Sequence, residues 1–332
     1  MIEEQKLHNS SINLMRIVAT IAVVIIHTTT RILEVAHFDF ASAPIAIFFN
    51  QLARFAVPLF FMISGYVLEV SYANYEDKWK FQKKRIEKIL WPYIIWSAIY
   101  YYWVYTNHAM GYWQSLMGGN ASYQLYFMPT LIIFYVIFPI LSSTLKWWSN
   151  KYILGAIGVG ELFLLTKDYY THSLNMAYPL AVMILNIFVF MLGMTVSHHL
   201  HRLESILEKY NFYWFLATIA VGIYVVYEGI SRYLSSGNYL AFYSQWRPSV
   251  LIYTILLAGS MYYLLSKINI EANVVRKISA LSMGVFFVHV LVLEMMWKLW
   301  PNEWLLGLMT IVLSYGVVYG ISKIPRLGSI LS

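Results

Sequence analysis

Long apolar segments separated by short polar stretches are the dominant pattern along the chain. Ten of these segments reach the length of about 17–25 residues that a helix needs to cross a bilayer. They occupy residues 12–33, 43–70, 89–106, 122–145, 151–167, 178–198, 211–230, 247–266, 278–298 and 304–322. The pattern therefore predicts an all-α fold, a polytopic membrane helix bundle of about ten transmembrane helices.

Composition agrees with this prediction and narrows the chemistry. Hydrophobic residues make up 60% of the chain and charged residues 12%, about half the charged share of a typical soluble domain. The connections are short, so we expect residues 1–332 to form a single membrane domain. Cysteine is absent, which excludes disulfides and thiolate nucleophiles. His198, His199 and His201 lack the spacing of a zinc site, so no metal is expected.

Lysine and arginine in the connections predict the orientation. With the N-terminus inside, 16 of the 23 basic residues fall in inside segments and five in outside connections, Arg247 among the latter. Cytoplasmic loops carry such an excess, so we expect both termini to be cytoplasmic. The same bias explains the net charge of +7 without nucleic acid as a partner. The first apolar run lacks a small-residue cleavage site, so we expect it to remain as the first span.

Arg16 and His27 lie eleven positions apart in the first segment. At about 100° and 1.5 Å per residue, they share one helix face and lie roughly 16 Å apart along the axis. Ionisable groups inside a bilayer are costly and are rare without a polar task. Each residue alone fits an interfacial arginine or a histidine that bonds a neighbouring helix. The pair on one face favours a functional site.

Three further positions have both a functional and a structural interpretation. Arg54 lies deep in the second segment and cannot lose its proton, so it needs carbonyls, an acid or an anionic ligand; we favour a functional cavity over a structural ion pair. Arg31 shares the face of His27 and either holds an acceptor or is a solvated loop charge. Ser64 and Gly65 either line a site or pack helices closely.

A basic cluster precedes the third segment. Such runs often only set topology or contact anionic lipid. The alternative is a docking surface for a phosphate-rich cytoplasmic ligand. Its members are Lys78, Lys80, Lys83, Lys84, Arg85 and Lys88.

These features occur together in one known family. The chain resembles acyltransferase family 3, bacterial membrane O-acyltransferases that modify cell-surface polysaccharides, over essentially its whole length. The motifs that carry the resemblance are Arg16 with His27, ARFAVPLFFMISGYVL at 53–68, KKRIEKILWPY at 83–93, YQLYFMPTLIIFYVIFPIL at 123–141 and SMGVFFVHV at 282–290. The second and fourth motifs are most similar to the branch of polysaccharide O-acetyl- and O-succinyltransferases.

The resemblance implies an enzyme of a bacterial plasma membrane with ten spanning helices. The donor would be an acyl-CoA, usually acetyl-CoA, arriving from the cytoplasm. The acceptor would be a hydroxyl of an extracytoplasmic glycan or its lipid-linked precursor. His27 matches the essential histidine, as a general base or a transient acyl carrier, and Arg16 matches its paired arginine. The resemblance is also compatible with a homo-oligomer and with contacts to membrane lipids.

The expected site residues fall into three groups. The catalytic group is His27, Arg16 and Arg54. The donor-binding group is Arg16, Lys83, Lys84, Arg85 and Lys88. The substrate-binding group is Arg31, Ser64, Tyr66, Gln124, Tyr126 and His289. The chain departs from the family's motifs at two places, which weakens the roles assigned there. Gln124-Leu125-Tyr126-Phe127 stands where many members have His-Leu-Trp-Phe, and Lys88 stands where a second arginine is common.

Two other functions are compatible with a polytopic bundle. One is a polysaccharide or small-solute exporter, which needs two-sided access and often helices broken near the midplane. We expect such a break only in the fifth segment, at Gly155, Gly158 and Gly160. The other is a non-catalytic sensing domain, which would require a fused soluble domain. The acyl group, the acceptor sugar and the oligomeric state are left open.

Overall fold

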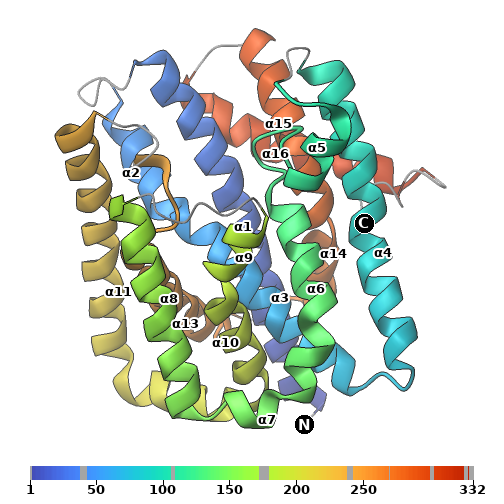
Figure 1. The fold of residues 1–332 in the computed structure, drawn as a ribbon, viewed down its shortest axis with the longest axis vertical. Helices are drawn as coiled ribbons and strands as arrows, with labels where there is room; N and C mark the ends of the chain where they lie inside the picture. The colour runs from blue at the N-terminus through green and yellow to red at the C-terminus, as the bar shows by residue number, and fades with distance from the viewer. Residues whose placement is uncertain are drawn as a thin grey trace. The chain divides into compact units, whose positions relative to one another are not determined.

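The computed structural model describes residues 2–37, 43–105, 109–171, 179–237, 242–268, 270–299, 303–324 and 328. Across these residues the regular secondary structure is helical and no strand occurs (Figure 1). The prediction of an all-α protein is confirmed.

Six of the described helical segments are long and apolar enough to cross a membrane. They are Ser10–Val35, Pro44–Ala73, Leu200–Ser236, Pro248–Leu265, Ser282–Leu299 and Leu305–Ser322. Two shorter apolar helices are Phe127–Ser143 and Ile187–His198. All eight coincide with predicted segments, and the chain is a multi-pass membrane protein. Of the two remaining segments, residues 89–104 and 151–167 lie on helices, and their crossing of the membrane stays a prediction.

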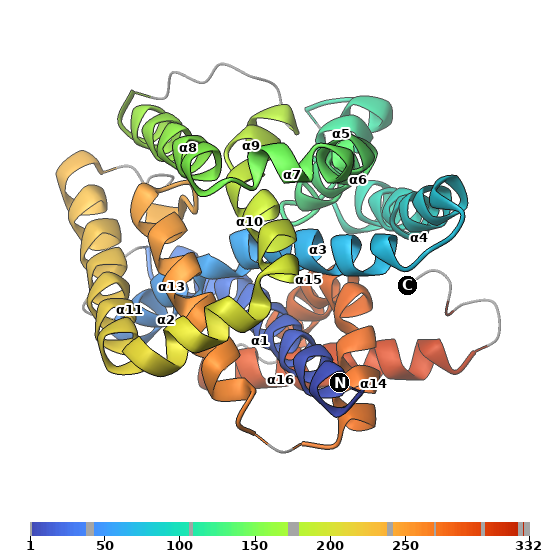
Figure 2. The ribbon, with the colours of Figure 1, turned by 90° about the horizontal axis from the view of Figure 1, so that it is seen from below.

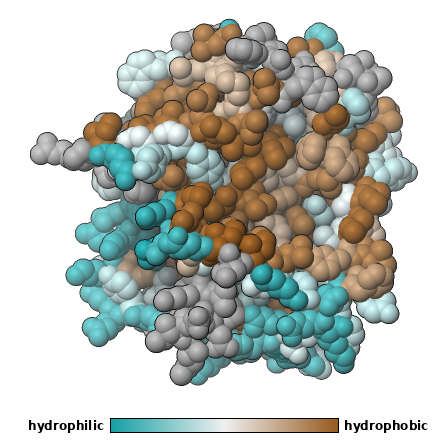
Figure 3. Space-filling view, turned by 180° about the vertical axis from the view of Figure 1, so that it is seen from behind, coloured by the Kyte–Doolittle hydropathy of each residue, from teal (hydrophilic) through white to brown (hydrophobic). Residues whose placement is uncertain are grey.

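The surface has the character of a lipid-facing protein. Figure 3 shows one face with a broad hydrophobic area and with hydrophilic side chains gathered toward its lower edge. Large apolar side chains such as Ile219, Leu308 and Val312 are exposed along the apolar helices. In water this exposure would be costly, whereas lipid tails solvate such side chains.

The helices form two compact units, which are described separately here. The first comprises Met1–Phe60 and His199–Gly316, and the second comprises Phe61–His198 and Val317–Ser332. The prediction that residues 1–332 form a single domain stays a prediction.

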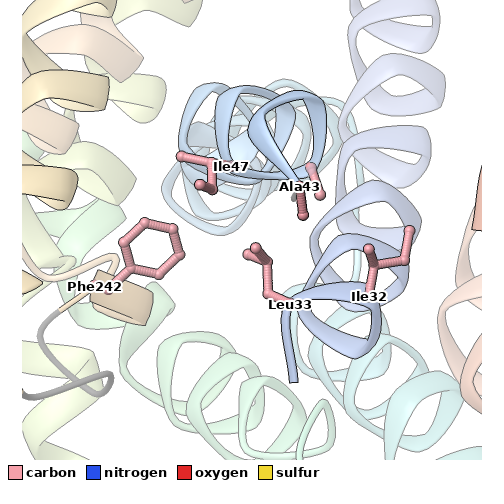
Figure 4. Close-up of a cluster of buried hydrophobic side chains, with 6 residues drawn as sticks. Ile32, Leu33, Ala43, Ile47 and Phe242 are labelled. Carbon is pink, nitrogen blue, oxygen red and sulfur yellow. The ribbon is translucent and has the colours of Figure 1, made fainter. Parts of the chain in front are cut away.

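Helix α1 is central to the first unit and packs against α2, α13, α14 and α15. Near its C-terminal end, Ile32 and Leu33 pack with Ala43, Ile47 and Phe242 in a buried apolar cluster (Figure 4). The helices of this unit are α1 (Ile2–Val35), α2 (Pro44–Leu52), η1 (Ala53–Phe55), α11 (Leu200–Ser236), α13 (Pro248–Leu265), α14 (Ala272–Ala280), α15 (Ser282–Leu299) and most of α16 (Glu303–Ser322).

In the second unit α4 packs against α6, and α6 packs against α9 (Figures 1 and 2). Two tyrosine hydroxyls connect the C-terminal part of α4 to α5. Tyr93 donates to the carbonyl of Leu116, and Tyr112 donates to that of Ile94. The helices are most of α3 (Ala56–Ala73), α4 (Lys78–Ile99), the π-helix η2 (Tyr100–Val104), α5 (Tyr112–Gly118), α6 (Phe127–Ser143), α7 (Leu145–Trp148), α8 (Lys151–Thr171), α9 (Leu180–Ile184) and α10 (Ile187–His198).

The expected helix break in the fifth segment is wrong. Helix α8 runs through all three glycines without interruption, since one glycine costs only about 1 kcal/mol within a helix. A Cβ added at Gly158 would lie 2.9 Å from the ring of Phe188, so this glycine makes room for an aromatic side chain.

The break lies in the sixth segment instead, at Leu185 and Asn186 between α9 and α10. The interruption leaves the amide N–H groups at the start of α10 without intrahelical partners. The buried Glu161 Oε2 of α8 accepts a hydrogen bond from one of them, Phe188 N, at 2.7 Å. A carboxylate there also complements the positive end of the helix dipole.

Candidate active site

Helix α1 places Arg16 and His27 as their spacing predicts. The helix is continuous from Ile2 to Val35, so the eleven-residue separation keeps both side chains on one face. Arg16 Nη1 donates to Ser279 Oγ of α14 at 3.4 Å. The His27 ring lies beside that of His289 on α15, with 5.1 Å between ring centroids and a tilt of 35°. One stripe of α1 therefore faces the consecutive helices α14 and α15.

The two histidines differ in accessibility. His289 is fully buried, and its Nδ1 lies 3.0 Å from the carbonyl oxygen of Val285. His27 is partly exposed and interacts electrostatically with His289 and with Arg54. The His27 ring therefore lies next to the ring of a fully buried histidine.

Arg54 lies in η1 and is only 4% exposed. Its Nη1 donates to the carbonyl oxygen of Tyr243 at 2.6 Å, and its Nη2 donates to Asn50 Oδ1. The guanidinium also lies 5.4 Å from the centroid of the Tyr243 ring. These three contacts hold the guanidinium in place with a backbone carbonyl, a side-chain amide and an aromatic ring.

Asn50 links Arg54 to the turn of α1 that bears His27. The side chain is fully buried, and its Nδ2 lies 3.2 Å from the carbonyl oxygen of Ile26 and 2.9 Å from Thr29 Oγ1. The same amide therefore binds the helix of His27 with its nitrogen and Arg54 with its oxygen. Sequence reasoning missed Asn50, although an amide one helical turn before a buried arginine was a usable signal.

A second buried arginine extends this polar network. Gln51 Nε2 donates to the carbonyl oxygen of Phe242 at 3.1 Å, and its Oε1 accepts from Arg247 Nη2 at 2.7 Å. Arg247 is fully buried and lies 3.5 Å from Glu228 Oε2. It is therefore not an exposed connection charge, as its place between two apolar segments suggested. Its neighbours supply the acceptors that a buried guanidinium requires.

Arg31 makes local contacts at the end of α1. Its Nη1 lies 3.5 Å from Glu34 Oε2, and its guanidinium lies 5.3 Å from the centroid of the Trp297 ring. The side chain is 35% exposed, so it is open to solvent as well as paired. Its role in acceptor binding stays a prediction.

The expected residues of α3 belong to the second unit. Ser64 is partly exposed and Tyr66 is buried. Gly65 between them lies against α10, where an added Cβ would be 2.1 Å from the carbonyl oxygen of Phe190. Close helix packing is therefore the role that the structure assigns to this glycine.

Gln124 and Tyr126 precede α6 in the same unit. Gln124 is 1% exposed, and its Oε1 accepts a hydrogen bond from Ser122 Oγ. Its Nε2 is buried and has no hydrogen-bond partner among the described residues. Tyr126 is partly exposed at the start of α6. Gln124 thus has a donor that a ligand could use.

The basic cluster occupies the first turns of α4, which begins where Asp77 Oδ1 accepts from Lys80 N at 2.9 Å. Lys83, Lys84 and Lys88 are exposed, and Arg85 is partly exposed. Lys83 Nζ is 3.9 Å from Glu87 Oε1. Exposed cations on successive turns are suited to phosphate groups.

The predicted residues are thus divided between the units. His27, Arg16, Arg54, Arg31 and His289 share the first unit. The second unit holds Ser64, Tyr66, Gln124, Tyr126, Lys83, Lys84, Arg85 and Lys88.

Comparison with known families decides the class of protein. A family model for acyltransferase family 3, described as an acyltransferase domain, matches residues 9–323, nearly the whole chain. The chain belongs to this acyltransferase family. The resemblance seen in the sequence motifs is confirmed, and the protein is a membrane O-acyltransferase. No curated protein and no solved structure matches it.

The first unit of the acyltransferase holds groups that acyl transfer requires. Transfer to a hydroxyl needs a base or nucleophile and a donor that stabilises the developing oxyanion. His27 supplies an imidazole beside the ring of His289, and Arg54 supplies a cation that donates to the carbonyl oxygen of Tyr243. Their assignment to these tasks stays a prediction.

Proposed function

We propose that this acyltransferase moves an acyl group, most simply acetyl, from cytoplasmic acyl-CoA to a hydroxyl of a cell-surface polysaccharide or its lipid-linked precursor. The proposal places it in a bacterial plasma membrane. The observation that carries it is the pair of histidine rings, His27 on α1 and His289 on α15, 5.1 Å apart within a chain of this family.

In this proposal His27 takes the proton of the acceptor hydroxyl while the hydroxyl oxygen attacks the thioester carbonyl. The new C–O bond forms, the C–S bond breaks, and the CoA thiolate leaves. Arg54 stabilises the negative charge on the carbonyl oxygen. In the two-step alternative, a nitrogen of His27 attacks first and carries the acyl group to the acceptor.

In the first unit Arg16 is the candidate for binding a phosphate of CoA. In the second unit the candidates for phosphate binding are the basic residues of α4, Lys83, Lys84, Arg85 and Lys88. The rise of α1 separates Arg16 from His27 by roughly 16 Å. The pantetheine arm has about twelve bonds between phosphate and sulfur and spans roughly 15 Å when extended. A phosphate near Arg16 would therefore leave the thioester near His27.

The acceptor would contact the remaining substrate-binding residues. Gln124 offers its Nε2, which has no hydrogen-bond partner within the described part of the chain, and Arg31 offers a partly exposed cation. Ser64, Tyr66 and Tyr126 offer hydroxyls. His289 would act from behind His27.

The test compares the purified wild type with His27→Ala and Arg16→Ala. Acetyl-CoA binding and thioester hydrolysis are measured, and Arg276→Ala removes an exposed cation of α14 as the matched control. We expect Arg16→Ala to weaken binding, and His27→Ala to bind donor but lose about 10²–10⁴-fold in turnover. A wild type that binds no acetyl-CoA far above cellular concentrations would remove acyl-CoA as the donor.

The break between α9 and α10 supports a second candidate, an exporter of the same fold. Broken helices whose ends point at polar groups are typical of transporter substrate sites, and Glu161 is bonded to the start of α10. Proteoliposomes loaded with labelled oligosaccharide would test it. Efflux that depends on the protein, without thioester turnover, would favour the exporter.

A further inference from the structure

His289 was expected to bind substrate, but its surroundings indicate a different task. We propose that His289 is a positioning residue: its Nε2 accepts a hydrogen bond from a ring N–H of His27 and so leaves the other His27 nitrogen as the reactive lone pair. This inference rests on the proposed role of His27 as base or acyl carrier.

The tautomer of the neutral His289 ring follows from its contact within α15. Its Nδ1 lies 3.0 Å from the carbonyl oxygen of Val285. A carbonyl only accepts hydrogen bonds, so Nδ1 carries the proton and Nε2 is an acceptor. The backbone of α15 thereby determines which nitrogen of His289 is available to a neighbour.

The acceptor nitrogen of His289 is buried and therefore needs a hydrogen-bond donor. His289 Nε2 is buried and has no hydrogen-bond partner among the described residues. A buried acceptor without a donor costs free energy. The neighbouring ring with a polar hydrogen is His27, whereas the ring of Phe286, with its centroid 6.0 Å away, has no N–H or O–H to donate.

The separation of the two rings suits one hydrogen bond. The nitrogen of an imidazole lies about 1.15 Å from the ring centre, so an N–H···N bond of about 2.9 Å puts two centroids roughly 5.2 Å apart. The observed separation is 5.1 Å. The two rings are tilted by 35°, and the proposed bond requires them to rotate until a His27 N–H points at Nε2 of His289.

The consequence for the reaction is a single reactive nitrogen on His27. In the direct route this nitrogen takes the acceptor's proton, the C–O bond forms and the C–S bond breaks. The imidazolium keeps its N–H bonded to His289 and then gives its new proton to the departing thiolate. In the two-step route the same nitrogen attacks the thioester carbonyl. A base held by a second group is a general arrangement in acyl transfer; here a neutral ring takes the place of the usual carboxylate.

The kinetic test uses two substitutions of His289. His289→Phe keeps an aromatic ring of similar size without the acceptor, and His289→Gln supplies Oε1 as an acceptor. We expect His289→Phe to lower kcat of acetyl-CoA turnover about 10- to 100-fold with the donor KM changed less than about twofold, and His289→Gln to restore most of kcat. Equal kcat in the wild type and His289→Phe overturns the inference, as does a loss that His289→Gln does not restore.

A spectroscopic measurement remains informative if a variant does not fold. The chain has nine histidines, and spectra of ¹⁵N-histidine-labelled protein can be assigned by comparing the wild type with His27→Ala. We expect one His27 tautomer and a ¹⁵N–¹⁵N coupling through the hydrogen bond to His289. A mixture of His27 tautomers without this coupling overturns the inference. Because no turnover is needed, an absence of acyl transfer in the wild type would count against the proposed function alone.

Discussion

Two glycines bring α3 and α10 together until one backbone touches the other. A Cβ added at Gly65 would lie 2.1 Å from the carbonyl oxygen of Phe190, and one at Gly193 would lie 1.9 Å from that of Met62. Real Cβ atoms essentially never approach a neighbour within 3.0 Å. We therefore expect Gly65→Ala to push the two helices apart by about 1 Å or to destabilise the second unit.

The magnitude follows from two opposing effects. Alanine is favoured over glycine within a helix by about 1 kcal/mol. Overpacking costs about 1–3 kcal/mol, and the upper end applies because a backbone carbonyl cannot rotate away as a side chain can. Gly65→Ala should thus destabilise by roughly 2 kcal/mol net. Gly155→Ala on α8 is the matched control, since no described atom lies within 4 Å of its added Cβ, and it should stabilise by about 1 kcal/mol.

The assay is thermal unfolding in detergent, followed by the fluorescence of the 12 tryptophans. A difference of about 3 kcal/mol between the two variants corresponds to a separation of roughly 4 °C in the unfolding midpoint of a chain of 332 residues. Identical scan rates are required because membrane proteins often unfold irreversibly. Equal midpoints for Gly65→Ala and Gly155→Ala would refute the contact between α3 and α10.

Three further predictions concern the polar network and the basic cluster. Asn50→Leu should lower both stability, by about 1–3 kcal/mol, and turnover, because the acceptor of Arg54 is lost; unchanged turnover would remove Asn50 from the site. Gly229→Ala should lower the midpoint in the same unfolding assay, because its Cβ would lie 2.3 Å from Gln51 Oε1, the acceptor that Arg247 Nη2 uses; an unchanged midpoint would contradict this. Lys84→Gln combined with Lys88→Gln should raise the donor KM several-fold at low salt and less at high salt; a shift insensitive to salt would argue against phosphate binding.

The sequence was sufficient to predict the apolar helices and the local geometry of the first span. Apolar length and period depend only on neighbours along the chain, so the all-α membrane bundle and the shared face of Arg16 and His27 followed directly. The motif set also identified the family, which the match to residues 9–323 confirms.

The position of the helix break could not be predicted from the sequence. Three glycines in the fifth segment suggested an interruption, yet α8 is continuous and the chain breaks between α9 and α10. Glycine permits a break but does not require one. The carboxylate of Glu161, from a different helix, bonds the start of α10.

The chain by itself determined which segments enter the membrane and which polar side chains enter with them. Only the tertiary structure decided their partners: His289 is 262 positions from His27, and Arg247 is 196 positions from Gln51. Local periodicity carries no information on such pairings, because they arise when helices distant in the sequence pack together. The buried polar groups then bond across the helices, since neither lipid nor water supplies donors and acceptors there.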